Sequence, residues 1–147
     1  MAAAISPRSR RRSTASSRAF AIVALKNHLA LDCELKPIGL GRGDQLAPEY
    51  LALNPNGLVP TVEDGELVIW ESNTIMRYLC AKHGGERLHP QDPARRTHVE
   101  RWMDWQLAAL TQPMAAMLMG YYRTPPDKRD PAALEAARLR AIDLWQI

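Results

Sequence analysis

The chain has 147 residues, 46% of them hydrophobic and 24% charged, which is enough to bury the core of one domain and part of a second. No apolar run approaches the ~20 residues needed to cross a membrane, and two cysteines without a secretory signal suit a reducing compartment, which we expect to be the cytoplasm. The net charge of +3 comes from the N-terminal end, because six basic residues precede the first acid, Asp32. Since a nucleic-acid-binding domain carries its basic patch on the fold itself, this distribution argues against a nucleic-acid partner.

Residues 1–18 are rich in arginine and serine and contain no acid. Mitochondrial transit peptides, basic arms and misread start codons all share this composition. Residues 2–5 are a weak candidate for a strand. Residues 9–12 cannot form an interior strand, because burying successive guanidinium groups without partners costs several kcal/mol each. We therefore expect an irregular basic segment here.

The next residues predict a helix, a strand and a short helix in turn. The segment 19–31 is predominantly apolar and predicts a helix, and the alternation over residues 33–38 predicts a strand. Three glycines then follow, at positions 39, 41 and 43. Residues 48–53 predict one short helical turn.

The stretch from residue 53 to residue 83 carries the clearest pattern. A cluster of turn formers at 54–57 leads through Val59-Pro60 into a strand at 61–63. Asp64-Gly65 is typical of a tight hairpin, and residues 66–70 form the returning strand. Apolar residues then recur at helical spacing, with Ser72 as the expected N-cap and a stop after His83.

Residues 86–93 are polar and contain proline, so we place a linker there and an all-helical part over residues 94–147. A long helix is expected up to about Tyr122, kinked at Pro113, and a second helix should open at Asp130-Pro131. Because the pattern stops at Ile147 without a capping signal, we expect this helical part to be incomplete.

This order resembles the N-terminal thioredoxin-like domain of the glutathione S-transferases, most specifically over residues 34–83. The resemblance implies an α/β thioredoxin-like domain at residues 19–85, followed by an incomplete all-α domain. It also implies a cis Val59-Pro60 bond, with both residues in the glutathione-binding site and the Val59 main chain paired with the cysteinyl part of glutathione. Glu71 and Ser72 would hold the γ-glutamyl end, and Gln45 the glycinyl carboxylate.

Physical chemistry supports this assignment for the γ-glutamyl end. A helix N-terminus offers free N–H groups and a positive dipole end to a carboxylate, while Glu71 suits the ammonium group. The alternative is that Ser72 merely caps the helix and Glu71 is a solvated charge. Pro60 likewise has an alternative, a trans proline at the first position of a strand.

Few residues are candidates for activating the sulfur of glutathione. No tyrosine precedes Tyr50 and no cysteine precedes Cys33, so the hydroxyls that remain before the first helix are those of Ser13, Thr14, Ser16 and Ser17. The resemblance places Ser16 or Ser17 at the activating position, with Ser16 favoured. Either serine has the alternative role of a helix cap.

The expected function is conjugation of the glutathione thiolate to a small electrophile by a homodimer, with glutathione as co-substrate and no membrane partner. Four histidines without ligand-like spacing predict no metal site. On the helical part, Trp102, Asp104 and Trp105 are weaker site candidates, and three methionines could line an acceptor pocket, although core packing explains them as well: Met114, Met117 and Met119. The alternative function is a truncated or frameshifted, non-catalytic member of the same family that at most binds glutathione.

Overall fold

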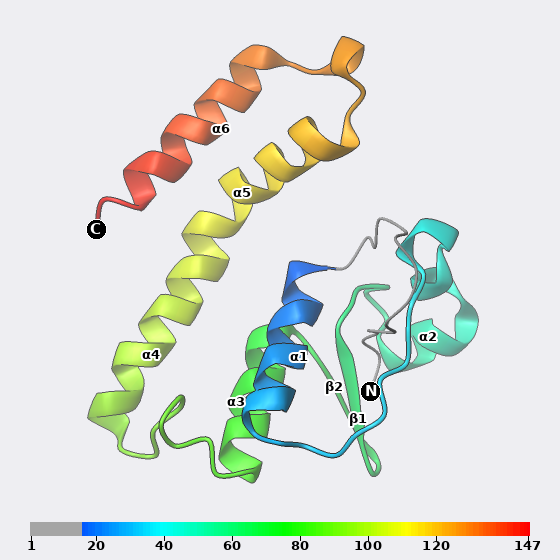
Figure 1. Ribbon diagram of the computed structural model, residues 1–147, viewed down its shortest axis with the longest axis vertical. Helices are drawn as coiled ribbons and strands as arrows, with labels where there is room; N and C mark the ends of the chain where they lie inside the picture. Colours follow the sequence, from blue (N-terminus) through cyan, green and yellow to red (C-terminus); the bar gives the residue numbers. More distant parts are fainter. Residues whose placement is uncertain (1–15) are drawn as a thin grey trace. The chain divides into compact units, whose positions relative to one another are not determined.

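The computed structural model describes residues 16–147, shown in Figure 1. The chain forms two compact units, the first ending at Gln91 and the second beginning at Asp92. The candidate strand at residues 2–5, the basic residues 9–12 and the hydroxyls of Ser13 and Thr14 lie outside the described residues.

The first unit combines three helices with one hairpin. Figure 1 shows α1 and α3 on one side of the hairpin and the α2 segment on the other. Two 3-10 turns, at Leu40–Arg42 and Asp44–Leu46, precede α2. The helices and strands of this unit are α1 (Ser17–His28), α2 (Pro48–Leu53), β1 (Thr61–Asp64), β2 (Leu67–Trp70) and α3 (Ser72–Lys82).

The hairpin is confirmed with a shift of one residue at its turn. β1 and β2 are antiparallel, with Thr61 opposite Trp70 and Asp64 opposite Leu67, so Asp64 belongs to the ladder. The turn therefore consists of Gly65 and Glu66. Gly65 has φ +62, a left-handed conformation that glycine adopts without steric cost.

The core of the first unit lies between the hairpin and the two long helices. Ile75 is fully buried, and Cys80 is a small buried hydrophobe whose thiol pKa is raised by burial. Seven buried side chains make up this core: Ile22, Leu25, Val62, Ile69, Ile75, Leu79 and Cys80. The helical spacing of the apolar residues before His83 thus correctly predicts the inner face of α3.

The predicted strand at residues 33–38 is wrong. Residues 31–39 form no regular element, and the sheet of the described chain has two strands. The Lys36 ammonium lies 3.9 Å from the Glu63 carboxylate, so this segment runs beside β1 without joining its ladder. Alternation favours a strand only where a neighbouring strand supplies hydrogen bonds, and no such neighbour lies among the described residues.

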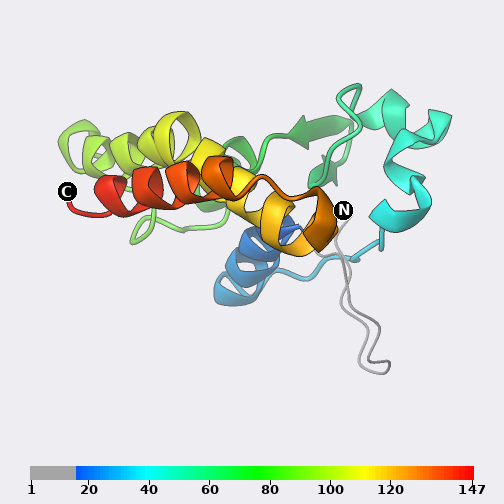
Figure 2. The ribbon, with the colours of Figure 1, turned by 90° about the horizontal axis from the view of Figure 1, so that it is seen from above.

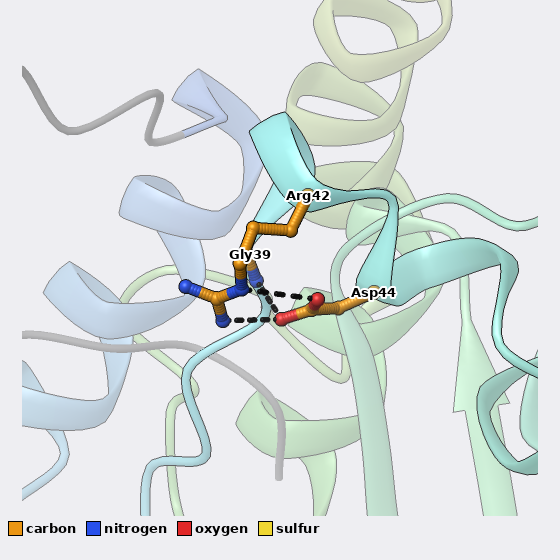
Figure 3. Close-up of polar contacts among 3 residues, drawn as sticks. All are labelled: Gly39, Arg42 and Asp44. Carbon is orange, nitrogen blue, oxygen red and sulfur yellow. Dashed lines mark hydrogen bonds and ion pairs between the residues drawn. The ribbon is translucent and has the colours of Figure 1, made fainter.

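An ion pair closes the loop that leads to α2. Figure 3 shows the Asp44 carboxylate accepting hydrogen bonds from the Arg42 guanidinium and from the Gly39 N–H, the latter at 2.9 Å. The Arg42 contact and then the Gly39 bond hold the pKa of the Asp44 carboxyl below its ordinary value. The contacts of Asp44 with Arg42 and Gly39 therefore fix the position of the chain just before Gln45.

The second unit is helical. In Figures 1 and 2, α5 and α6 run side by side, and Leu134, Ala141 and Leu144 form the buried stripe of α6. Asp92 and Asp130 cap α4 and α6, because each carboxylate accepts a hydrogen bond from the backbone N–H of the third residue of its helix. The helices are α4 (Pro93–Trp105), α5 (Thr111–Leu118) and α6 (Pro131–Leu144), with π-helical segments at Gln106–Leu110 and Met119–Arg123 and a 3-10 turn at Pro126–Lys128.

The π-helical segment at Gln106–Leu110 is where the long helix changes. Pro113 has no N–H to donate and its ring crowds the carbonyl one turn earlier, so a regular α-helix cannot continue through this point. Thr111 instead donates from its hydroxyl and from its backbone N–H to the Gln106 carbonyl. The predicted kink is thus a widened turn on the N-terminal side of the proline.

Candidate functional site

The loop between α2 and β1 is held by a buried polar network. Asn54, 2% exposed, donates from its amide to the Leu58 carbonyl at 2.7 Å and to the Thr61 hydroxyl at 3.3 Å. The Asn54 side-chain oxygen accepts from the backbone and the side chain of Asn56, each at 3.1 Å. One asparagine therefore ties together both ends of a turn that contains no regular hydrogen-bond ladder.

Tyr50 completes this network from α2. Its hydroxyl donates to the Leu58 carbonyl at 2.7 Å and lies 2.8 Å from the Thr61 hydroxyl. Because the single phenolic hydrogen is directed to Leu58, the Thr61 hydroxyl donates to Tyr50 and accepts from Asn54. Every polar group of the network is thereby satisfied, which fixes the position of the chain immediately before Val59.

Gly57 lets this loop lie close to the preceding segment. Its φ is +59, and a Cβ at this position would stand 2.9 Å from the Leu46 side chain and 3.3 Å from the Gln45 carbonyl. No other residue meets both conditions without strain. The backbone conformation therefore favours glycine at this position, and a side chain here would in addition crowd the Gln45 carbonyl.

The Val59-Pro60 peptide bond is cis, as the resemblance implies. The Leu58 carbonyl is used by Tyr50 and Asn54, whereas no backbone hydrogen bond of Val59 occurs among the described residues. Val59 thus offers main-chain polar groups to a ligand beside a buried proline.

Glu71 and Ser72 lie at the point where β2 becomes α3. The predicted N-cap is displaced by one residue: Glu71 occupies the cap position, its carbonyl accepts from the Ile75 N–H at 2.9 Å, and Ser72 is the first helical residue. Glu71 has φ +71, an uncommon conformation for a residue with a side chain, and it is exposed. Neither side chain caps the helix, since no side-chain cap bond forms there.

One hollow on the first unit joins these groups. We call it the Val59 hollow, and eight residues of the described chain line it: Arg18, Asn54, Asn56, Leu58, Val59, Pro60, Glu71 and Ser72. Four of the five residues predicted to hold glutathione, Val59, Pro60, Glu71 and Ser72, therefore lie around one opening at the start of α3. The hollow thus brings together the main chain of Val59, the exposed Glu71 carboxylate and the N-terminus of α3.

Comparisons with known proteins agree with this geometry. The family described as "Glutathione S-transferase, N-terminal domain" matches residues 13–81. Glutathione S-transferase GstB of Escherichia coli K12 is 50% identical over 91 residues, which cover 60% of this chain and 44% of that protein. A crystal structure of the theta class glutathione S-transferase from Xanthomonas axonopodis pv. citri with glutathione bound superposes with a TM-score of 0.80 at 38% identity, covering 88% of this chain and 62% of that one.

Residues 13–81 match the N-terminal domain of the glutathione S-transferase family. A probable glutathione S-transferase of rice, GSTF2, is 30% identical over 123 residues, which cover 80% of this chain and 57% of that protein. The chain thus spans about half the length of the curated relatives that it matches. The fold is that of the family, a thioredoxin-like domain with a small sheet followed by a helical region.

The remaining predicted site residues are less clearly placed. Ser16 is half-buried at the N-cap of α1, and its hydroxyl makes no cap hydrogen bond. Ser17 is the first residue of α1, and its side chain lies outside what the structure describes. Gln45 does not line the Val59 hollow, and its side-chain oxygen is buried without a hydrogen-bond partner in the described part of the chain.

Four lining residues were not among the predicted ligands. Asn54 and Asn56 read as turn formers only, and Arg18 belongs by composition to the basic N-terminal segment. Leu58 lines the hollow with an exposed apolar side chain. A usable indication existed for Arg18: it is the one basic residue within the first turn of α1, close to both candidate serines.

In the helical unit, the two candidate tryptophans, Trp102 and Trp105, contact each other. The Trp105 ring makes edge-on contacts with Trp102 at 5.4 Å and with Trp145 at 6.1 Å between ring centroids. Trp102 is 47% exposed, so core packing does not account for it in this unit. Met114 and Met119 are likewise exposed, whereas Met117 is half-buried.

No cluster of three or more potential metal ligands occurs among residues 16–147. Over the same residues, no helix combines the length and the apolar character that crossing a bilayer requires.

Tyr50→Phe should lower the free energy of unfolding by about 2 kcal/mol, because a buried hydroxyl loses two hydrogen bonds. Burial raises the pKa of Tyr50 above its ordinary value, so the neutral phenol is the stabilising form. Its contribution is complete below the ordinary tyrosine pKa of about 10 and is lost as the pH rises through the higher pKa of the folded chain. Urea titrations at neutral pH and above about pH 10 should show the gap between wild type and variant narrowing at alkaline pH; a constant gap would contradict the argument.

Proposed function

We propose that this chain binds glutathione in the Val59 hollow and transfers its thiolate to a small electrophile. The observation that carries the proposal is that Val59, Glu71 and Ser72 line one hollow although they come from a loop, a strand end and a helix start. Glutathione bound to the Xanthomonas relative supports the choice of ligand. Residues 19–85 would form the glutathione-binding domain and residues 94–147 the helical domain.

The proposed binding mode pairs the charged and hydrogen-bonding groups of glutathione with those of the site. The γ-glutamyl carboxylate accepts from the Ser72 hydroxyl and lies at the N-terminal end of α3, where the helix dipole favours negative charge. The ammonium group pairs with the exposed Glu71 carboxylate. The cysteinyl N–H and C=O pair with the main chain of Val59, beside buried Pro60, as a short strand would. The placement of Gln45 on the glycinyl carboxylate requires its side chain to turn toward the ligand.

The sulfur is held as the thiolate by a hydroxyl at the start of α1, for which we propose Ser16 with Ser17 as the second choice. Ser16 is at the N-cap without a cap bond, so its hydroxyl is available to donate to sulfur. Cysteine thiols titrate near ~8.5, so a donor and the positive end of α1 both increase the thiolate fraction at neutral pH.

The wider assembly is also part of the proposal. The electrophile would be held with the help of the helical unit, and the working form would be a homodimer, as is general in this family. We place the reaction in the cytoplasm, where glutathione is in its thiol form, because Cys33 and Cys80 are free thiols rather than a disulfide.

Retention on immobilised glutathione, followed by conjugation of a chromogenic electrophile, tests the proposed function. We expect retention, elution by free glutathione, and turnover. Retention without turnover for any of a panel of electrophiles would favour the alternative, a glutathione-binding module without transferase activity. Passage through the column without retention would overturn both.

Ser16→Ala and Ser17→Ala separate the two serines. Loss of one hydrogen bond to the thiolate costs about 1.5 kcal/mol, so Ser16→Ala should lower kcat/KM about tenfold and leave retention unchanged. Ser17→Ala is the matched control and should retain full kcat/KM. A tenfold loss in Ser17→Ala with none in Ser16→Ala would move the activating role to Ser17.

A further inference from the structure

A second hollow on the first unit lies at the opposite end of β1 and α3 from the Val59 hollow. We call it the Cys33 hollow, and residues 29–33 and 62–65 line it together with Leu79, Lys82 and His83. Its volume is about 600 Å³, within the range of ~300–1,000 Å³ that is usual for small-molecule sites. Among the described residues it shares none with the Val59 hollow, so the proposed binding of glutathione leaves it without a function.

The inner wall of the Cys33 hollow is apolar. Val62 on β1 and Leu79 on α3 are each 4% exposed and belong to the core of the unit. Leu29 and Leu31 pack against that core and are half-buried. A ligand seated here would remove apolar surface from water, which is favourable in proportion to the area covered. An apolar body of small-molecule size therefore suits this wall.

The charged groups of the Cys33 hollow are mostly acidic. Asp32, Glu63 and Asp64 contribute three carboxylates, whereas Lys82 contributes the one fixed cation among the described lining residues. That cation is already neutralised, because the Lys82 ammonium and the Tyr78 hydroxyl both donate to the Asp64 carboxylate. With histidine counted as neutral, three carboxylates against one ammonium leave an excess of two negative charges.

Asp32 is the carboxylate of this lining that has no partner. The Glu63 carboxylate lies 3.9 Å from the Lys36 ammonium, and the Asp64 carboxylate is paired with Lys82. The Asp32 carboxylate makes no ion pair or hydrogen bond within residues 16–147. Since Asp32 is also exposed, a cation that enters the hollow can meet its free negative charge.

We propose that the Cys33 hollow binds a lipophilic organic cation, with the apolar body of the ligand on Val62 and Leu79 and its positive charge next to Asp32. Charge complementarity selects the cation, since an anion of the same shape would face the excess of two negative charges. A cation whose charge is spread over an apolar frame also loses less hydration on burial than a compact ammonium does. The site is separate from the Val59 hollow, so binding there does not require transferase activity.

Tetraphenylphosphonium and tetraphenylborate are the probes for this site, because they share one apolar shape and carry opposite charges. Each is added to the full chain, and alkylation of Cys33 by iodoacetamide, a neutral reagent, is followed by mass spectrometry. Cys33 is half-buried and lines the hollow, whereas Cys80 is buried and lines neither hollow, so Cys80 is the internal reference. Retention on immobilised glutathione, with and without the cation, reports on the Val59 hollow.

At about ten times its Kd, tetraphenylphosphonium should slow the alkylation of Cys33 about tenfold, because roughly a tenth of the chains remain free. Tetraphenylborate at the same concentration should leave the rate unchanged. The net charge of +3 attracts the anion to the chain as a whole, so a preference for the cation belongs to the hollow. Asp32→Asn should weaken binding of the cation about tenfold. Glu66→Gln, which removes an exposed carboxylate outside the hollow, should bind it as wild type does.

Equal protection of Cys33 by both ions, or unchanged binding of the cation in Asp32→Asn, would overturn the proposal. Protection by neither ion would do so too, as would a Cys33 that resists iodoacetamide in the free chain. Loss of retention on glutathione when the cation is added would place the cation in the Val59 hollow and also overturn it. Selective protection in a chain that is not retained on glutathione would support this site while the proposed transferase function fails.

Discussion

Replacing Asn54 by alanine is expected to lower the free energy of unfolding by about 3 kcal/mol and to abolish measurable retention on glutathione. The side chain is 2% exposed and makes four hydrogen bonds, to Leu58, to Thr61 and twice to Asn56. Each bond is worth about 1 kcal/mol, and the partners left behind are themselves partly buried. Because the same bonds hold the chain before Val59, the loss of stability and the loss of binding have one cause.

Asn27→Ala is the matched control for this prediction. Asn27 is exposed on α1, and alanine has the higher helix propensity, so its replacement should change stability by less than about 0.5 kcal/mol. Equilibrium urea unfolding measures both variants, and isothermal titration with glutathione measures binding. An Asn54→Ala variant that unfolds with wild-type stability would show that the network is not what fixes this loop.

Glu71 should show the opposite relation between stability and binding. Its φ of +71 costs an ordinary residue about 1–3 kcal/mol, and glycine removes this cost in exchange for greater freedom of the unfolded chain. Glu71→Gly should therefore raise the free energy of unfolding by about 1 kcal/mol. Glutathione binding should fall by about 2 kcal/mol, roughly thirtyfold in Kd, because the ammonium group loses its charged partner.

Glu71→Ala separates the two effects, since it removes the carboxylate and keeps the strained backbone. We expect the same loss of binding with little change in stability. Glu66→Ala, which removes an exposed carboxylate from the hairpin turn, is the control for net charge and should bind normally. If Glu71→Gly gained stability and still bound glutathione as wild type does, the residue would be a strained turn without a binding role.

The hairpin and the helix of residues 53–83 could be predicted from the sequence because local rules are sufficient there. A glycine at the turn, β-forming residues on both sides and a change of period at residue 71 each specify their own geometry. The boundaries were less accurate: Asp64 extends the ladder, and the cap of α3 moves from Ser72 to Glu71. Such shifts of one residue are decided by which carbonyl accepts the first helical bond, and composition does not encode this choice.

Other features depend on residues that are distant in sequence. The prediction of a strand at 33–38 failed because alternation describes one strand and says nothing about its neighbour. The contact of Tyr50 and Asn54 with Thr61 joins a helix, a loop and a strand, so no spacing rule reveals it. Arg18 was assigned by composition to an irregular segment of residues 1–18, whereas the structure has α1 beginning at Ser17.

The most direct test of the central claim is a titration of the isotopically labelled chain with glutathione, followed by the backbone amide resonances. We expect the largest shifts at the amides of Val59, Glu71 and Ser72, with smaller ones at Ser16 and Arg18. The amides of α6, which belongs to the other unit, serve as the internal reference. Resonances at Val59, Glu71 and Ser72 that do not move at saturating glutathione would contradict the claim that this hollow is the glutathione site.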